Sequence, residues 1–341
     1  MKSPPIDLIW TVTRLCPWDC AFCCVDAVPM GRGARQASLS ELSYSEKISV
    51  LDNLDGFTPK IDISGGDPLA VPDTLPLIQE CSNRFGSPNV TVTATGATLR
   101  RMDPGFAKDH VGELNFTYDM PGPDGSDTRP PKYSEVNLAA AKRFMDVGLS
   151  LRAECPLTTR NVSPVVIRQI FNDLHVAGVK SLLATRMFPV GRGERHATLL
   201  PSPEQYRIAI SELREMEARL GYPKLKLQCA LRFFDNPGQS ENPCDLMRVS
   251  FGLMPEGTLL ASPWAYGLRG RPLDDVWVLG NLANDPLSKI LSSEKAQYYR
   301  AHLNDNFGHC KVICWVNSPK LSPVDRLFDV SDPLAVAKGP L

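Results

Sequence analysis

Three cysteines lie close together near the start of the chain, where residues 16–23 read CPWDCAFC. The spacing of Cys16, Cys20 and Cys23 is C-x3-C-x2-C, so one short loop can present all three sulfurs to the same point. Three thiolates can hold three irons of a four-iron cluster and leave the fourth iron open to a substrate or cofactor. A zinc site is an alternative, because Cys24 could supply a fourth thiolate. A thioredoxin-type C-x-x-C pair is another alternative.

A second group of cysteines lies in the last third of the chain: Cys229, Cys244, Cys310 and Cys314. Four thiolates would satisfy every iron of a second cluster, which could pass or accept an electron but would offer no open site. A structural zinc ion with the same four ligands is one alternative. The other is that Cys229 is a core residue and one ligand is missing. The remaining cysteines, Cys24, Cys81 and Cys155, are interpreted as small core residues.

The composition limits what these cysteines can be doing. Ten cysteines in 341 residues are too few for a disulfide scaffold. The 37 basic and 38 acidic residues balance, so no general basic surface indicates nucleic acid binding. No apolar run reaches the roughly 18 residues of a membrane helix, and the start lacks a signal-peptide pattern. We therefore expect a cytoplasmic protein whose cysteines stay reduced, with no membrane or nucleic acid partner.

Short strand-like runs alternate with amphipathic helical runs over the first two thirds of the chain. Strands are predicted over 8–13, 60–64, 90–95, 113–119, 150–156 and 181–186, and helices over 41–54, 73–84, 135–147, 165–177 and 203–220. This alternation predicts parallel strands joined by right-handed crossovers. Six units are too few for a closed eight-stranded barrel. The predicted fold class is α/β, with a partial (β/α)6 TIM barrel preferred over a doubly wound sheet.

One face of nearly every predicted strand is polar. The polar sets are Thr11 and Thr13; Asp62 and Ser64; Thr91, Thr93 and Thr95; Asn115, Thr117 and Asp119; and Arg152 and Glu154. Because side chains alternate along a strand, each set faces one side of the sheet. A half-exposed antiparallel sheet would show the same pattern, but the intervening helices disfavour it. We predict a barrel with a polar lumen that holds a ligand.

Three charged residues of these sets are candidate catalytic residues. Arg152 and Glu154 share the inward face of the fifth predicted strand, and Asp119 ends the fourth. A satisfied buried ion pair is the ordinary interpretation of such residues. The alternative is that they position a substrate and accept a proton.

The pattern changes after the predicted barrel. A strand over 225–229, a hairpin over 249–254 and 258–262 and a helix over 286–303 indicate a small α+β unit. We predict a barrel domain over 1–224, a second domain over 225–319 and a tail over 320–341 that wraps the surface.

With these motifs the chain resembles the radical S-adenosylmethionine (SAM) superfamily over residues 8–315. The aromatic Phe22 precedes the third cysteine of the C-x3-C-x2-C motif, and Ser64-Gly65-Gly66-Asp67-Pro68 is similar to the family's Gly-Gly-Glu-Pro motif. Asp67 stands where the family usually has glutamate, which shortens the carboxylate. Further family-like turns follow later predicted strands at Thr95-Gly96, Thr158–Asn161 and Met187–Gly193.

The resemblance implies cofactors and the residues that bind them. Cys16, Cys20 and Cys23 would hold a [4Fe-4S] cluster that cleaves SAM to a 5′-deoxyadenosyl radical. The SAM-binding residues would be Phe22, Gly65, Gly66, Asp67, Pro68, Thr95, Asn161 and Arg186. The last third is similar to a twitch domain, the shortened SPASM domain, which implies a second [4Fe-4S] cluster on Cys229, Cys244, Cys310 and Cys314. An external one-electron reductant of the flavodoxin or ferredoxin type would be a partner.

The expected reaction follows the inosamine dehydrogenase type of the butirosin pathway, which has a twitch domain. We expect a small polar natural-product intermediate (a sugar, aminocyclitol or nucleoside) whose alcohol is oxidised to a ketone, with the second cluster as electron acceptor. Redox-neutral decarboxylation or epimerisation is an alternative. Maturation of a ribosomal peptide is another, disfavoured because such enzymes often carry a leader-binding domain, whereas this chain reaches Cys16 early. A non-enzymatic electron carrier or zinc scaffold would leave the glycine motif and the polar lumen unexplained.

Overall fold

The computed structural model describes residues 5–31, 40–121, 128–235, 241–244 and 246–336. Within them, the six predicted barrel strands form adjacent parallel strands in the order β1-β4-β5-β6-β7-β8. Their bounds are β1 (Pro5–Thr11), β4 (Thr58–Ser64), β5 (Val90–Thr93), β6 (Glu113–Thr117), β7 (Ser150–Leu157) and β8 (Ser181–Arg186). The α/β prediction and the partial barrel are confirmed.

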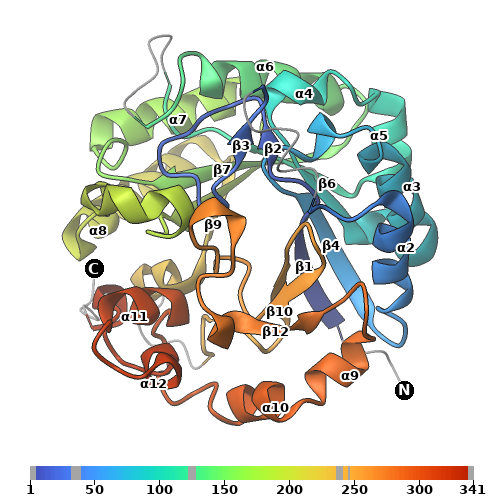
Figure 1. Ribbon diagram of the computed structural model, residues 1–341. Helices are drawn as coiled ribbons and strands as arrows, with labels where there is room; N and C mark the ends of the chain where they lie inside the picture. The colour runs from blue at the N-terminus through green and yellow to red at the C-terminus, as the bar shows by residue number, and fades with distance from the viewer. Residues whose placement is uncertain (1–4, 32–39, 122–127, 236–240, 245, 337–341) are drawn as a thin grey trace.

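Helices form an arc around the outside of these strands (Figure 1). They are α2 (Tyr44–Asp52), α3 (Thr74–Phe85), α4 (Gly96–Leu99), α5 (Pro104–His110), α6 (Tyr133–Met145), α7 (Pro164–Val176) and α8 (Pro203–Leu220). Local sequence explains where they begin: Ser202 caps α8 in a capping box with Gln205, with Pro203 in the first turn. The sequence predicts the five longer helices but neither α4 nor α5.

The alternation along each strand separates core from lumen. In β4, Ile61 and Ile63 are fully buried in the main hydrophobic core, whereas Asp62 between them lines a cavity inside the barrel. In β7, Leu151, Ala153 and Cys155 are core residues, while Arg152 and Glu154 line the cavity. The polar lumen expected from the sequence is therefore present.

The last third of the chain extends the same sheet at both edges. Strand β9 (Lys224–Leu227) lies parallel to β8, and β10 (Ser250–Leu253) lies parallel to β1. The hairpin partner β11 (Thr258–Leu260) is antiparallel to β10, and β12 (Val278–Asn281) is antiparallel to β11. The predicted hairpin is confirmed. The domain boundaries at 224 and 319 remain predictions.

Short helices complete the C-terminal part: α9 (Leu287–Leu291), α10 (Glu294–Ala301), α11 (Lys311–Asn317), α12 (Pro323–Leu327) and α13 (Pro333–Val336). The first four of them lie in the lower part of Figure 1. The single helix predicted over 286–303 is wrong, because Ser293 caps a new helix by accepting a hydrogen bond from the Ala296 backbone N–H. The predicted surface tail also needs correction, because Asp332 is fully buried and Leu334 lies in the main core.

None of the helices in the described ranges is both long enough and apolar enough to span a membrane.

Candidate functional site

The first three cysteines lie on a closed loop beyond the carboxyl end of β1. Strands β2 (Leu15–Cys16) and β3 (Val28–Pro29) pair at the base of this loop. The Trp18 backbone N–H lies 3.5 Å from the Cys16 sulfur, and the Ala27 N–H lies 3.4 Å from the Cys23 sulfur. The Trp18 N–H favours the Cys16 thiolate and so opposes burial, which raises the pKa of that thiol overall.

The two glycines after β4 hold that strand end against the cysteine loop. The Gly66 N–H donates to the Thr13 carbonyl at 2.8 Å, and the Asp67 N–H donates to the Leu15 carbonyl at 2.7 Å. A Cβ at Gly66 would lie 2.5 Å from the carbonyl oxygens of Arg14 and Leu15, which is too close for any other residue. The Gly-Gly pair therefore allows the end of β4 to pack directly against the backbone that leads into the cysteine loop.

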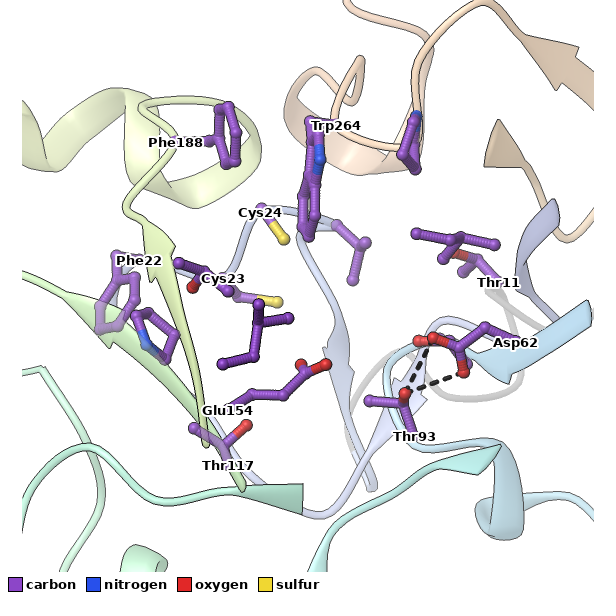
Figure 2. Close-up of a pocket in the computed structure, with 18 of the residues that line it drawn as sticks. Thr11, Phe22, Cys23, Cys24, Asp62, Thr93, Thr117, Glu154, Phe188 and Trp264 are labelled. Atoms are coloured by element: carbon purple, nitrogen blue, oxygen red, sulfur yellow. Dashed lines mark hydrogen bonds between the residues drawn. The ribbon is translucent and has the colours of Figure 1, made fainter. Parts of the chain in front are cut away.

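A cavity of about 290 Å³ opens beside this loop at the carboxyl ends of the strands. Its wall includes eight residues predicted to form the site, namely Phe22, Cys23, Gly65, Gly66, Thr95, Arg152, Glu154 and Arg186. Figure 2 shows Phe188 and Trp264 at one end, and Asp62, Thr93, Thr117 and Glu154 at the other. The Phe188 and Trp264 rings stack with centroids 4.8 Å apart. The cavity thus has an aromatic rim and a polar floor.

The floor holds more carboxyl groups than cations. Arg152 pairs with Glu113 at 2.7 Å and more loosely with Glu154 at 3.6 Å. Asp62 accepts a hydrogen bond from the Thr93 hydroxyl at 2.8 Å. Burial raises the pKa of Glu154 to about 7, with Arg152 opposing the shift and Asp62 adding to it. Burial also raises the pKa of Asp62. Glu154 can therefore gain or lose a proton near neutral pH.

Three residues predicted to bind SAM lie outside the cavity wall among the described residues: Asp67, Pro68 and Asn161. The Asp67 carboxylate accepts hydrogen bonds from the Thr95 and Thr98 hydroxyls at 2.5 and 2.6 Å and is fully buried. The Asn161 amide donates to the backbone carbonyls of Asp119 and Pro156. In this structure Asp67 and Asn161 brace the loops that carry the wall.

Asp119 also lies outside the wall, because it forms an ion pair with Arg129, which does line the cavity. Both Nε and one terminal nitrogen of Arg129 donate to Asp119 Oδ2, at 2.9 and 2.7 Å. The buried ion pair considered for Asp119 from the sequence is the arrangement observed. The carboxylate faces Arg129 rather than the lumen, so it is poorly placed to contact a substrate.

Sequence reasoning missed Arg129, which lies within the wall beside the cysteine loop. Its guanidinium stacks on Phe22 at 4.4 Å and on Tyr133 at 4.7 Å. The Ala21 N–H donates to the Thr128 carbonyl at 3.1 Å, which joins this segment to the loop. Burial raises the pKa of Cys20, and the positive charge of Arg129 opposes that shift. No motif marks Arg129, since its position depends on long-range pairing.

The later cysteines converge at a second place, around Cys229 at the start of the 3-10 helix Cys229–Phe234 and Cys310 at the start of α11. The Cys229 thiol is within hydrogen-bond reach of Cys244 and Cys310. Its hydrogen bond, with help from the nearby Lys311, lowers the pKa of Cys244 to about 6. Cys314 lies one turn beyond Cys310 on α11, and its sulfur is 3.9 Å from the Asn306 amide nitrogen. The predicted four cysteines are therefore neighbours.

The three remaining cysteines, Cys24, Cys81 and Cys155, belong to neither predicted ligand group. Cys81 and Cys155 lie in the main core as predicted. Cys24 also packs against hydrophobic core residues as predicted, and in addition it lines the cavity beside Cys23. All ten cysteines are free thiols. Within the described ranges, no group of three or more cysteine, histidine, aspartate or glutamate side chains is arranged so that it could hold a metal ion. Both cysteine groups offer only soft sulfur donors, the ligand type preferred by iron–sulfur clusters.

The chain shows weak similarity to known proteins, and no family model matches it. It is 24% identical over 291 residues to a PqqA peptide cyclase from Streptomyces rochei, which covers 84% of this chain and 75% of that protein. It is also 26% identical over 110 residues to human Molybdenum cofactor biosynthesis protein 1, covering 32% of this chain and 17% of that protein.

Solved structures with the same fold include anSMEcpe with bound AdoMet, with a TM-score of 0.63 and 14% identity over 87% of this chain and 80% of that one. Another is SuiB from Streptococcus suis bound to the precursor peptide SuiA, with a TM-score of 0.66 and 14% identity. That match covers 86% of this chain and 65% of SuiB, so the chain spans just under two thirds of SuiB's length. These likenesses establish a shared fold.

Proposed function

We propose that this chain is a radical SAM enzyme that uses SAM and two [4Fe-4S] clusters to modify a peptide side chain. The observation that carries the proposal is the three-cysteine loop, held by Gly65 and Gly66 at the mouth of a cavity beyond the parallel strands. Both cysteine groups fit iron–sulfur clusters by their donors. When bound, the first cluster and SAM supply a 5′-deoxyadenosyl radical that removes a hydrogen atom from the substrate.

The residues of the chain bind and enclose these groups. Cys16, Cys20 and Cys23 would hold the first cluster and leave one iron open. Gly65, Gly66, Thr95 and Phe22 line the cavity next to Cys23 and would contact SAM. Arg129 places a positive charge behind Cys20. The four later cysteines would hold the second cluster with every iron satisfied.

The polar floor would receive the reacting part of the substrate and its proton. Arg152 is held by Glu113, which leaves Glu154 and Asp62 facing the cavity. A carboxyl with a pKa of about 7 can accept a proton from a substrate radical and return it to solvent. Glu154 is therefore the proton acceptor in this proposal, and Arg152 orients it.

The comparisons favour a peptide substrate over the small molecule that the sequence led us to prefer. The PqqA peptide cyclase matches most of this chain, and the SuiB structure contains a precursor peptide. A further solved relative in fold is anSMEcpe with AdoMet and the Cp18Cys peptide. Oxidation of a small polar alcohol remains the second candidate. It is favoured by the hydrogen-bonding groups of the floor: Asp62, Thr93, Thr117 and Glu154.

An isotope experiment distinguishes the two substrate classes. The reconstituted enzyme is supplied with SAM and reductant, and with either a perdeuterated peptide digest or a mixture of perdeuterated sugars and aminocyclitols. Deuterium appears in 5′-deoxyadenosine only when the pool supplies the abstracted hydrogen. We expect transfer from the peptides. Transfer from the sugars alone would refute the peptide proposal and support the second candidate.

The metal content tests the cofactors themselves. Anaerobic reconstitution should give about eight irons per chain, and about four after Cys229 and Cys244 are both replaced by alanine. About four irons with one zinc in the unchanged protein would refute the second cluster.

A further inference from the structure

Arg186 lines the cavity, but its guanidinium forms an ion pair with a residue that is distant in the sequence. It ends β8, and its two terminal nitrogens donate to the two oxygens of Asp332 at 2.7 and 3.0 Å. Both residues are buried, and 146 positions separate them in the sequence. Such a bidentate pair fixes the two groups in direction as well as distance. The guanidinium expected to contact SAM is therefore engaged behind the cavity wall.

The other side of the pair reaches the second cysteine group. Asp332 Oδ2, which accepts the shorter of the two hydrogen bonds from Arg186, also accepts one from the Cys310 backbone N–H at 2.9 Å. The second Asp332 oxygen accepts one from the Leu334 N–H at 3.1 Å. Asp332 therefore anchors the start of α11, where Cys310 is the N-cap residue and Cys314 lies in the first turns of the helix.

A second contact from Arg186 leads to the same cysteines. Its backbone N–H donates to the Gln228 side-chain oxygen at 3.2 Å. Gln228 lines the cavity and immediately precedes Cys229, whose thiol reaches Cys310. Arg186 is thus joined to Cys310 through Asp332 and to Cys229 through Gln228.

We propose that Arg186 and Asp332 form a positioning pair that joins the cavity wall to the second cysteine group and sets the reduction potential of the cluster held there. The inference rests on the proposed function, because it requires that cluster. The two charges act in opposite directions. Asp332 lies against a cysteine ligand and disfavours an added electron, whereas Arg186 compensates that negative charge.

The test measures the midpoint potential of the second cluster by redox titration followed by electron paramagnetic resonance. The first cluster is removed by replacing Cys16, Cys20 and Cys23 with alanine, so that only the second contributes. In this background Asp332→Asn should raise the potential, and Arg186→Gln should lower it. We expect the ratio of reduced to oxidised cluster at a fixed potential to change about tenfold in each direction, or about 59 mV.

A matched control is Arg214→Gln, which breaks an ion pair with Asp235 at the end of the segment that begins at Cys229. That pair is partly exposed, so water should screen it and the potential should stay unchanged. A purely structural role would shift both test variants in the same direction or leave the potential unmoved, and either result overturns the proposal. If Arg186→Gln loses the cluster, the midpoint potential of Asp332→Asn alone tests the proposal. Loss of the cluster from both variants also overturns the tuning role.

The same experiment separates this inference from the proposed function. An iron–sulfur signal in the background protein establishes the second cluster whatever the two variants do. No signal there would refute the second cluster and the inference together. A signal without opposite shifts would refute the inference alone.

Discussion

Replacing Glu154 with glutamine removes a titrating carboxyl from the cavity floor at nearly constant size. In the folded protein the pKa of Glu154 is raised from its ordinary 4.5 to about 7, chiefly by burial. The folded state therefore holds the proton more tightly than the unfolded chain does. The tighter binding of this proton stabilises the folded state fully below pH 4.5, and the stabilisation is lost as the pH rises through 7. The difference of about 2.5 in pKa corresponds to about 3 kcal/mol.

The prediction concerns the free energy of unfolding of the metal-free protein. Glu154→Gln should be more stable than the parent at pH 8.5, and about 2.5 kcal/mol of that advantage should disappear at pH 5. Urea unfolding at both pH values measures it, under reducing and anaerobic conditions. Glu204→Gln is the control, because Glu204 pairs with Arg207 on an exposed face of α8 and should change the free energy by less than about 0.5 kcal/mol. If Glu154→Gln is instead less stable at pH 8.5, the ion pair with Arg152 outweighs burial and our reasoning about the floor is wrong.

Three further substitutions test other parts of the site. Gly66→Ala should destabilise the protein by about 1–3 kcal/mol and lower its iron retention, because its Cβ meets two backbone carbonyls at 2.5 Å; unchanged unfolding and iron content would contradict that packing. Trp264→Ala should remove the stack on Phe188 and raise the ratio of 5′-deoxyadenosine to product, measured by chromatography; an unchanged ratio would show that the rim does not retain substrate. Cys310→Ala should keep SAM cleavage while product formation stalls, and normal turnover would exclude an electron-accepting role for the second cluster.

The sequence predicts the barrel well because its signals are local. Strands such as β4 and β7 alternate between apolar and polar residues, and that alternation also predicts which side chains face the lumen. The cysteine loop and the Gly65-Gly66 pair are continuous motifs, so their place at the strand ends follows from the order of elements. The same alternation predicts that Arg152 and Glu154 of β7 face the lumen.

Contacts between distant segments could not be predicted from these signals. Strand alternation predicts that Asp119 faces the lumen, but its carboxylate instead forms an ion pair with Arg129 from an irregular segment. The ion pair between Arg186 and Asp332 could not be predicted either, because Asp332 belongs to the tail that the sequence places on the surface. Glu113 follows the same alternation as Asn115 on β6, which places its side chain on the side of the sheet where it pairs with Arg152. Pairings of this kind are set by tertiary packing rather than by local spacing.

The central claim is that the cysteine loop of Cys16, Cys20 and Cys23 supports reductive cleavage of SAM. The most direct measurement is the formation of 5′-deoxyadenosine by the anaerobically reconstituted protein with SAM and a one-electron reductant. We expect the unchanged protein and Cys81→Ala, whose sulfur lies in the core, to form it, and Cys16→Ala to form none. No 5′-deoxyadenosine from the iron-loaded unchanged protein, or undiminished formation by Cys16→Ala, would contradict the claim.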